Sequence, residues 1–408
     1  MKYILILGDG MADKGVEALN GLTPLEQADT PYFDYLAANG CNGLLQTIPE
    51  GFPPGSEVGN LSILGYDIKD CFEGRGPLEA AAMGYDMEPD DLAMRCNIIA
   101  TDDSGNILNH HGNNLTSEEA EVLINFLNEK LGDDNFHFYP GIQYRHLLII
   151  KEGIKDLYLF PPHDHVGENT QSLINKTLEL CKVKQSEGTA KKLMSLVEKS
   201  RPILESHPIN KRRAVEGKGM ANMIWPWSEG YRPKMKPLSS RFPSINGGAM
   251  ITAVDLLKGI GKYAGLKPIE VEGATGRADT NYEGKAKAAI EALKDNDFVF
   301  IHVEATDEAS HDRDVSLKLK TIEYLDQRIL KPILEETVFK GIPVKIALLP
   351  DHLTSVETGK HLSDPVPFVI YGQGIRPDKV TLFDEINCRK GGYGFLKPTE
   401  FIKKFLEE

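Results

Sequence analysis

Long apolar runs are absent from this sequence of 408 residues, and cysteines are few. No run approaches the roughly 20 apolar residues that a membrane-spanning helix needs. The apolar stretch 3–7 is too short for a signal peptide and lacks a small-residue cleavage motif. The five cysteines are scattered without a C-x-x-C pair, which argues against a disulfide framework or a cysteine zinc site and favours a reducing compartment. We therefore expect a soluble, cytoplasmic protein that does not bind membranes.

Positive charge is also scarce. Lys and Arg number 46 against 60 Asp and Glu, which gives a formal net charge of -14. A field of that sign repels nucleic-acid phosphates and anionic lipids, so general binding to either is not expected. An anionic substrate would need a local cluster of cationic side chains or metal ions. With 41% hydrophobic and 26% charged residues, the composition is typical of a folded globular protein, and the length suggests two or three domains.

Three apolar runs, each ending in an acidic residue, indicate a buried sheet. They are residues 3–7, 298–303 and 344–349. Runs of this kind suit parallel strands covered by helices on both faces, and helical patterns lie at Tyr282–Leu293 and Leu317–Ile333. The sequence therefore predicts an α/β fold with a mostly parallel sheet between helices. In such sheets ligands bind beyond the carboxyl ends of the strands, which is where the acidic residues lie.

The middle of the chain has shorter and more mixed patterns. Apolar runs occupy Met94–Ala100, His146–Ile150 and Asp156–Phe160, and helices are predicted at Thr116–Leu131, with capping-box spacing of Thr116 and Glu119, Thr170–Leu180 and Thr189–Lys199. The stretch Trp225–Lys234 is rich in Pro and Gly and indicates a connector, in which Trp225 and Trp227 are expected to pack in a core or an interface. Because sheet strands flank this region on both sides, we expect a smaller α+β domain over residues 83–242. It would be inserted into a domain made of residues 1–82 and 243–408.

Carboxylates and imidazoles near the predicted strand ends form a candidate metal centre. Asp307 and His311 are four residues apart, which places both side chains on one face of a helix. Oxygen and nitrogen ligands without thiolate suit manganese, zinc or magnesium rather than copper(I) or an iron–sulfur cluster. Three carboxylates and three imidazoles are enough for two divalent ions. The full set consists of Asp9, Asp307, His311, Asp351, His352 and His361.

Ser56 is the candidate nucleophile. It follows Gly55 and precedes a helix-like run, Val58–Leu64, so we expect it at a helix N-terminus. The free backbone N–H groups and the helix dipole favour a phosphoryl anion there. A serine hydroxyl is a weak nucleophile at neutral pH unless a base or a metal ion lowers its pKa. A helix-capping serine without catalytic function is the alternative.

Seven segments together resemble one family nearly end to end. They are LGDGMAD (7–13), PGSEVGNLSILGYD (54–67), GRGPLEAAAMG (74–84), RCN (95–97), GATGRADTNYEGKA (273–286), FVFIHVEATDEASHDRD (298–314) and PDH…H-x-SDPVPF (350–368). The sequence is similar to the archaeal-type cofactor-independent phosphoglycerate mutases of the alkaline phosphatase superfamily. The resemblance implies an alkaline-phosphatase-like metal-binding core and an inserted phosphotransferase domain that closes over a small phosphorylated substrate.

The resemblance also implies ligand roles and a reaction. One ion would be held by Asp307, His311 and His361, and the other by Asp9, Asp351, His352 and the Ser56 oxygen. The implied reaction interconverts 3-phosphoglycerate and 2-phosphoglycerate through a phosphoserine at Ser56, without bisphosphoglycerate. Domain closure would exclude water, which would otherwise hydrolyse the phosphoserine. The candidate substrate-binding cations are Arg145, His163, Lys285, Arg75 and Arg95.

This chain departs from the family pattern in two places. Asn114 stands where a GHIS-like stretch of the family implies a substrate-binding histidine, with His110 and His111 nearby. Thr306 and Ser310 replace the more usual Pro and Gly beside the metal ligands. The implied ligands themselves are all present, so the metal chemistry is affected less than the recognition of the substrate.

Three other functions remain as alternatives. A related branch of the family has been proposed to act as a homoserine kinase and carries similar metal residues, although this chain has no GxxxxGK[ST] nucleotide loop. A non-catalytic binding protein with this fold would be expected to have lost metal ligands, and none is lost. A hydrolytic phosphatase or sulfatase would have little use for an insertion of about 160 residues. The sequence leaves the metal identity and the oligomeric state open.

Overall fold

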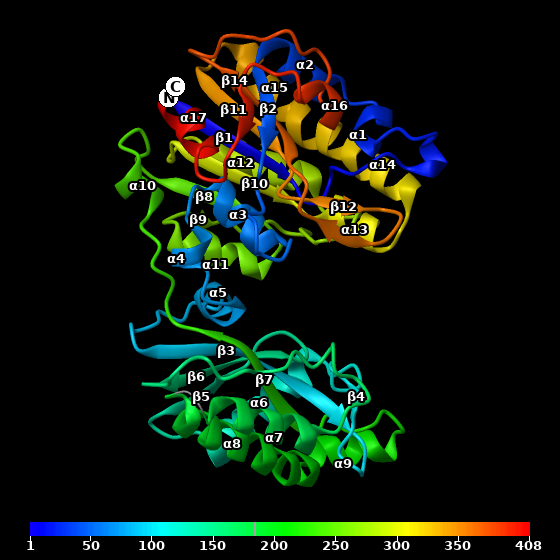
Figure 1. The fold of residues 1–408 in the computed structure, drawn as a ribbon, viewed down its shortest axis with the longest axis vertical. Helices are drawn as coiled ribbons and strands as arrows, with labels where there is room; N and C mark the ends of the chain where they lie inside the picture. The colour runs from blue at the N-terminus through cyan, green and yellow to red at the C-terminus, as the bar shows by residue number, and fades with distance from the viewer. Residues whose placement is uncertain (183–184) are drawn as a thin grey trace. The chain divides into compact units, whose positions relative to one another are not determined.

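The computed structural model describes residues 1–182 and 185–408, and the chain divides into two compact units (Figure 1). The core unit consists of Met1–Phe72 and Lys234–Glu408. The inserted unit consists of Glu73–Pro233. The core unit is therefore discontinuous in sequence, and both boundaries fall earlier in the chain than the expected 83 and 242.

Local packing explains where the two boundaries fall. The helix α5 (Arg75–Ala82) precedes residue 83 but packs on strands of the inserted unit, so closely that a Cβ at Gly76 would meet the Ala93 carbonyl oxygen at 2.4 Å. At the second boundary the chain is already bound to the core unit before residue 242, because the Tyr66 hydroxyl donates a hydrogen bond to the Lys236 carbonyl oxygen at 2.6 Å. Helix α5 therefore belongs to the inserted unit, and the segment after Pro233 belongs to the core unit.

The core unit contains an eight-stranded sheet in the order β15-β2-β14-β11-β1-β10-β8-β9. All strands run in the same direction except β14, which is antiparallel to both of its neighbours. The three predicted apolar runs are the adjacent central strands β10, β1 and β11, which confirms the mostly parallel sheet. The bounds are β1 Lys2–Gly8, β2 Cys41–Leu45, β8 Gly248–Ile251, β9 Lys267–Pro268, β10 Phe298–Val303, β11 Val344–Leu349, β14 Val366–Gly372 and β15 Gly394–Leu396.

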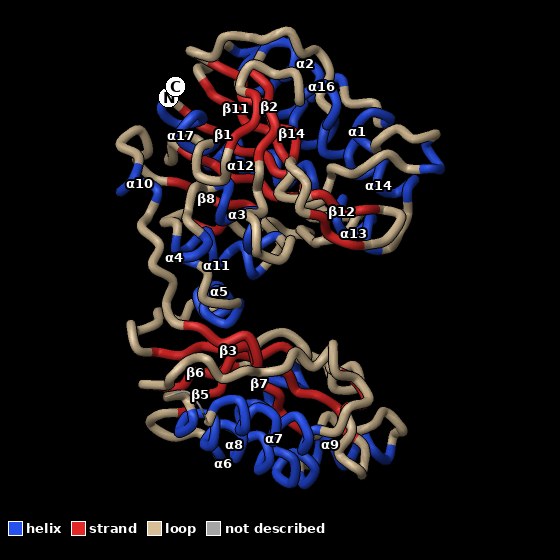
Figure 2. The backbone as a smooth tube through the Cα atoms, in the orientation of Figure 1, coloured by secondary structure: helices blue, strands red, loops and turns tan. Residues whose placement is uncertain are grey.

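Helices flank this sheet on two sides, as Figure 2 shows, and this explains why β10 and β11 are buried along their whole length. The predicted helix Leu317–Ile333 is present as α14, a π-helical turn over Leu325–Leu330 and α15. Among the described residues, no helix has both the length and the apolarity to span a membrane. The helix bounds are α1 Pro24–Gln27, α2 Pro31–Asn39, α3 Ser56–Ile63, α4 Ile68–Cys71, α10 Leu238–Arg241, α11 Asp255–Tyr263, α12 Tyr282–Ala292, α13 Ala305–His311, α14 Val315–Tyr324, α15 Lys331–Glu336, α16 Glu385–Cys388 and α17 Phe401–Glu407. Two single 3₁₀ turns lie at Glu17–Leu19 and Val338–Lys340, and a short hairpin is formed by β12 Leu353–Ser355 and β13 Lys360–Leu362.

The inserted unit is built on a five-stranded sheet in which every pairing is antiparallel. Its strands follow the order β4-β3-β6-β5, and β7 pairs with β3. This unit is the smaller α+β domain that the sequence predicts. Its elements are α5 Arg75–Ala82, β3 Asp91–Thr101, β4 Ile107–Asn109, α6 Ser117–Leu131, β5 Phe136–Tyr139, β6 Arg145–Lys151, α7 Thr170–Cys181, α8 Glu187–Ser206, α9 Pro208–Val215 and β7 Met223–Gly230.

Two predictions for this region are wrong. The segment Trp225–Lys234 is not a connector as a whole, because its first half completes β7 and pairs with β3. Long-range strand pairing there outweighs the local effect of the Pro and Gly residues. The run Asp156–Phe160 forms no strand, because its backbone bonds to side chains and turns through positive φ at Asp156 (67°) and Tyr158 (49°).

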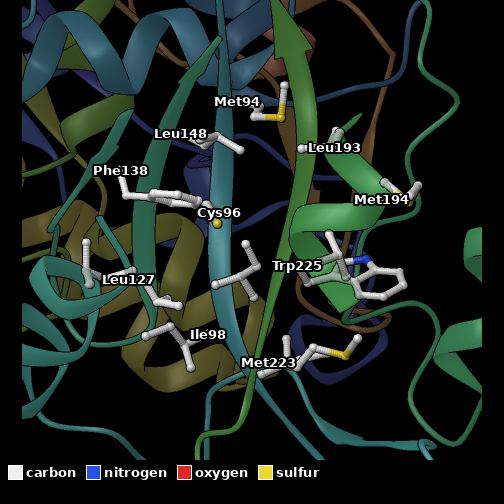
Figure 3. Packing of buried hydrophobic residues seen from close by; sticks show 14 of the residues in the cluster. Met94, Cys96, Ile98, Leu127, Phe138, Leu148, Leu193, Met194, Met223 and Trp225 are labelled. Atoms are coloured by element: carbon white, nitrogen blue, oxygen red, sulfur yellow. The ribbon is translucent and has the colours of Figure 1, made fainter. Parts of the chain in front are cut away.

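The side chains of β3 point alternately to the two faces of this sheet. Met94, Cys96 and Ile98 point into the main apolar core, which includes Leu127 of α6 and Leu193 of α8 (Figure 3). Since successive residues of a strand point to opposite faces, the residues between them belong to the other face. That face carries the polar side chains of Arg95 and Asn97 from β3.

Candidate active site

The carboxyl ends of β1, β10 and β11 bring most of the predicted site residues of the core unit together. Asp9 follows β1, and Asp307 lies in α13, which begins directly after β10. Asp351 and His352 follow β11. His361 lies on β13, opposite Thr354 of β12, so the hairpin returns it to the same edge of the sheet. This is the ligand-binding edge that parallel-sheet topology predicts.

One group of donor atoms is formed by Asp307, His311 and His361, all within 4.8 Å of one another. His311 Nε2 lies 3.0 Å from Asp307 Oδ2, and His361 Nε2 lies 3.5 Å from Asp307 Oδ1. The Nδ1 atoms of the two rings face backbone carbonyl oxygens, that of Gly359 at 2.9 Å and that of Pro54 at 3.3 Å. Because a carbonyl only accepts, Nδ1 carries a proton in both rings, and both Nε2 atoms face the carboxylate.

A second group is formed by Asp9, Asp351 and His352, again within 4.8 Å of one another. Ser56 adds its hydroxyl to this group: Oγ lies 3.1 Å from Asp9 Oδ2 and 3.3 Å from His352 Nε2. Ser56 is the first residue of α3 and follows Gly55, as predicted. The hydroxyl therefore lies at the positive end of the helix dipole.

The electrostatics of these groups favour a bound cation. Burial and then the negative charges of Asp351 and Asp307 raise the pKa of Asp9 well above its usual range. Burial alone would also raise the pKa of Asp307, but hydrogen bonds from His311 and His361 outweigh it and lower that pKa. The hydrogen bond to Asp307 raises the pKa of His311 to about 9. Like charges buried together in this way are stabilised by a positive charge between them.

The donor set fits divalent metal ions. Each group offers carboxylate oxygen and imidazole nitrogen without a thiolate, which suits manganese, zinc or magnesium. The Nδ1 contacts of His311 and His361 are the outer hydrogen bonds that orient metal-binding imidazoles in proteins. Each group therefore could hold one ion.

The four predicted cations of the inserted unit lie near one another within that unit. The Arg95 guanidinium lies 4.5 Å from the centre of the Trp227 ring, and the His163 ring centre lies 5.1 Å from it. Burial lowers the pKa of Arg95, and the positive charges of Arg75 and Arg145 lower it further, whereas Glu79 opposes them. Arg95 also forms an ion pair with Glu79 at 3.0 Å. Trp227 is therefore a shared ring surface for Arg95 and His163.

Lys285 differs from the other predicted cations because it is fully buried. It lies on α12 of the core unit, and its Nζ donates a hydrogen bond to the carbonyl oxygen of His302 at 3.1 Å. Burial lowers its pKa to about 8. In this structure Lys285 supports the strand end at His302, and its role in substrate binding stays a prediction.

Comparison with known proteins places the chain in a family. The model of 2,3-bisphosphoglycerate-independent phosphoglycerate mutase matches residues 37–210. The protein of that name from Methanosarcina mazei is 47% identical over 407 residues, which cover 98% of each chain. The chain belongs to this mutase family. The resemblance noted in the sequence is thereby confirmed.

Solved structures agree with membership of the mutase family. A protein from Pyrococcus horikoshii is 33% identical with a TM-score of 0.83 and covers 100% of this chain and 96% of that chain. The cofactor-independent phosphoglycerate mutase from Thermoplasma acidophilum is 26% identical with a TM-score of 0.69, covering 100% and 99%. The fold of this chain is therefore similar to that of a solved mutase of this family.

Three residues beside the donor groups were not predicted from the sequence. His302 Nε2 lies 2.9 Å from Asp9 Oδ2, and Asn60 donates from Nδ2 to Asp351 Oδ2 at 2.9 Å. Thr354 donates from its hydroxyl to Asp307 Oδ1 at 2.5 Å. Two of them carry a signal in the sequence: Asn60 lies one helical turn after Ser56, and His302 is a polar residue near the end of a buried strand. Thr354 has no such signal, since a threonine in a short hairpin is unremarkable.

The residues at which this chain departs from the family pattern have defined contacts. Thr306 donates a hydrogen bond from its hydroxyl to the Asp9 carbonyl oxygen, and Ser310 donates to the Thr306 carbonyl oxygen at 2.8 Å. In the inserted unit, the ring centre of His110 lies 6.0 Å from that of His163. Asn114 instead lines a hollow of about 320 Å³. His110 therefore lies beside His163.

Proposed function

We propose that this chain interconverts 3-phosphoglycerate and 2-phosphoglycerate without bisphosphoglycerate. The observation that carries the proposal is the position of Ser56 at the N-terminus of α3, with its hydroxyl 3.1 Å from Asp9 and 3.3 Å from His352. Phosphoryl transfer needs a positioned nucleophile and neutralisation of charge. A hydroxyl among carboxylate and imidazole donors, at the N-terminal end of a helix dipole, meets both needs.

Two divalent ions are part of this proposal. Asp307, His311 and His361 would hold one, and Asp9, Asp351, His352 and the Ser56 hydroxyl would hold the other. When bound, such ions would lower the pKa of the serine hydroxyl and neutralise charge on the phosphoryl group. Manganese, zinc and magnesium all suit these donors.

Ser56 would carry the phosphoryl group during the reaction. Its Oγ forms a bond to phosphorus while the bond between phosphorus and the glycerate oxygen breaks, and the serine proton ends on that oxygen. The free glycerate then turns, and its other hydroxyl attacks the phosphoserine and returns the proton to Ser56. The first-turn N–H groups of α3 stabilise negative charge in both transfers. No other reactant is consumed, so the net reaction is an isomerisation.

The inserted unit is proposed to bind the glycerate. Arg75, Arg95, Arg145 and His163 form a group of cationic or ionisable side chains, and guanidinium groups pair with carboxylates through two parallel hydrogen bonds. Holding the glycerate while water is excluded prevents hydrolysis of the phosphoserine. Without this binding of the glycerate, water would hydrolyse the phosphoserine, and the mutase would act as a phosphatase.

The proposed location is the cytoplasm. All five cysteines are buried and free in the structure. Free thiols persist in a reducing compartment, where disulfides are rare. The place of a phosphoglycerate mutase in sugar metabolism is consistent with this location.

Turnover and labelling of Ser56 test the proposal together. Protein supplied with Mn²⁺ and 3-phosphoglycerate, without bisphosphoglycerate, should form 2-phosphoglycerate, and mass spectrometry should find a phosphate on the peptide that contains Ser56. Ser56→Ala should lose the phosphopeptide and reduce turnover by roughly 1,000-fold or more.

Ser62→Ala is the matched control for that experiment. Ser62 lies on the same helix, and its buried hydroxyl has no partner in the described parts of the chain, so turnover should be retained. Turnover by Ser56→Ala would contradict the nucleophile assignment. Consumption of ATP with homoserine, together with no 2-phosphoglycerate, would favour the related kinase branch instead.

A further inference from the structure

A single buried hydroxyl touches both donor groups of the core unit. Thr354 is fully buried on β12, and its Oγ1 donates a hydrogen bond to Asp307 Oδ1 at 2.5 Å. The same Oγ1 lies 3.1 Å from His352 Nδ1. Asp307 belongs to one donor group and His352 to the other. One side chain therefore links the two groups.

The protons of this link can be placed by elimination. An ionised carboxylate only accepts hydrogen bonds, so the single hydroxyl proton of Thr354 goes to Asp307. The Thr354 oxygen must then accept from His352, which places the imidazole proton on Nδ1. This leaves the lone pair of His352 on Nε2, which faces Ser56 Oγ at 3.3 Å and Asp9 Oδ1 at 3.4 Å. The hydroxyl thus sets the tautomer that a metal-binding imidazole needs.

The position of Thr354 is itself fixed by buried hydrogen bonds. Its backbone N–H donates to the Ala12 carbonyl oxygen at 3.1 Å, and its carbonyl oxygen accepts from Lys318 Nζ at 2.6 Å. Lys318 is fully buried and also pairs with Asp13 Oδ2 at 2.9 Å. Because hydrogen bonds fix both the backbone N–H and the carbonyl oxygen of Thr354, its hydroxyl is held in one position.

We propose that Thr354 is a positioning residue that couples the two metal groups. Its hydroxyl orients a carboxylate oxygen of one group and fixes the tautomer of an imidazole of the other. The inference rests on the proposed two-metal function. Removal of the hydroxyl should weaken ion binding at both groups, and loss of such outer hydrogen bonds typically costs about 10- to 100-fold in metal affinity.

Three substitutions separate the hydroxyl from the shape of the side chain. Thr354→Val keeps the branched shape and removes the hydroxyl, whereas Thr354→Ser keeps the hydroxyl. Thr354→Ala is measured alongside, in case the second methyl group of valine does not fit. Thr47→Val is the matched control, because Thr47 is fully buried and its hydroxyl has no partner among the residues that the structure describes.

The readout is ion binding to metal-free protein. Each variant is titrated calorimetrically with Mn²⁺, and its unfolding temperature without metal is measured to verify folding. We expect Thr354→Val and Thr354→Ala to bind both ions about 10- to 100-fold more weakly than the wild type. Thr354→Ser and Thr47→Val should both bind two ions nearly as the wild type does.

The outcomes distinguish this inference from the function on which it rests. If the wild type binds two ions and Thr354→Val binds them equally well, the coupling role is wrong while the two-metal site stands. If only one of the two affinities falls, Thr354 supports one group and couples nothing. If the wild type binds fewer than two ions, the proposed metal function fails and this inference fails with it.

Discussion

The Nε2 atoms of His311 and His361 lie 3.0 Å apart, and both face the carboxylate of Asp307. Each ring also points its Nδ1 at a backbone carbonyl oxygen. Two imidazole nitrogens this close share either a proton or a cation. A divalent ion satisfies both nitrogens and the carboxylate at once, and its binding displaces the proton.

Removal of one of these imidazoles should remove one ion. His361→Ala, purified with excess Mn²⁺, is expected to retain one ion per chain where the wild type retains two, because two of the three protein donors rarely hold a divalent ion. Metal analysis by mass spectrometry gives the stoichiometry, and turnover of 3-phosphoglycerate should be lost in parallel.

His165→Ala is the control for the loss of a histidine. His165 lies in the inserted unit and pairs with Glu168 at 2.8 Å, away from both donor groups in the sequence and in its hydrogen bonding. This variant should keep two ions. Two ions on His361→Ala would show that the first donor group does not bind metal as assigned.

The buried ion pair of Lys318 and Asp13 should be costly to break on one side. Both side chains are almost completely buried, with Nζ and Oδ2 2.9 Å apart. Lys318→Met leaves the Asp13 carboxylate buried without its cation, which is expected to lower the free energy of unfolding by about 3–5 kcal/mol. Thermal unfolding of the metal-free protein measures this.

The double variant Asp13→Asn/Lys318→Met tests the reason for that loss. Without the unpaired charge, part of the stability should return, so the two substitutions should not be additive. A melting temperature of Lys318→Met within about 2 °C of the wild type would mean that the pair contributes little.

His146 should make the inserted unit sensitive to acid. It is buried on β6, accepts a hydrogen bond from Gly141 N–H at Nδ1 (3.1 Å), and burial lowers its pKa to about 3. In the unfolded chain its pKa is near 6.5. Between these values the unfolded state binds a proton that the folded state does not, so stability falls as pH falls, by up to about 1.4 kcal/mol per pH unit.

The test uses the intrinsic fluorescence of the inserted unit. The chain has two tryptophans, and both lie on β7 of that unit. Urea unfolding of His146→Asn, followed by this fluorescence from pH 7 to pH 4, should show a smaller loss of stability than the wild type. His137→Asn on the adjacent strand β5 should behave like the wild type. If the free energy of unfolding fell equally with pH in His146→Asn and in the wild type, the prediction would be refuted.

Much of the site was predictable because its residues follow from local rules. Asp9, Asp351 and His352 end apolar runs that become neighbouring parallel strands, and such strands gather their carboxyl ends at one edge. Asp307 and His311 share a helix face by their spacing. These positions depend on periodicity and topology, which the sequence carries directly.

What the sequence did not reveal has a different cause. The charge of Lys285 gives no sign of its burial, which depends on which face of α12 packs on the sheet. The Pro and Gly residues of Trp225–Lys234 suggest a loop, whereas β7 forms because β3 lies beside it. Thr354 acquires its role from a hydroxyl placed between two distant segments. Such relationships arise from tertiary packing, which local propensity does not encode.

The central position of β1 has a consequence for synthesis of the chain. Its two neighbours, β10 and β11, come from the last third of the sequence. The same holds for β2, whose neighbours β14 and β15 are also synthesised late. A nascent chain that elongates at 5–20 residues per second leaves β1 without partners for roughly 15–60 s. During that time the inserted unit, which is contiguous, emerges complete from the ribosome. The first strand to be synthesised is thus among the last to pair with its neighbours in the sheet.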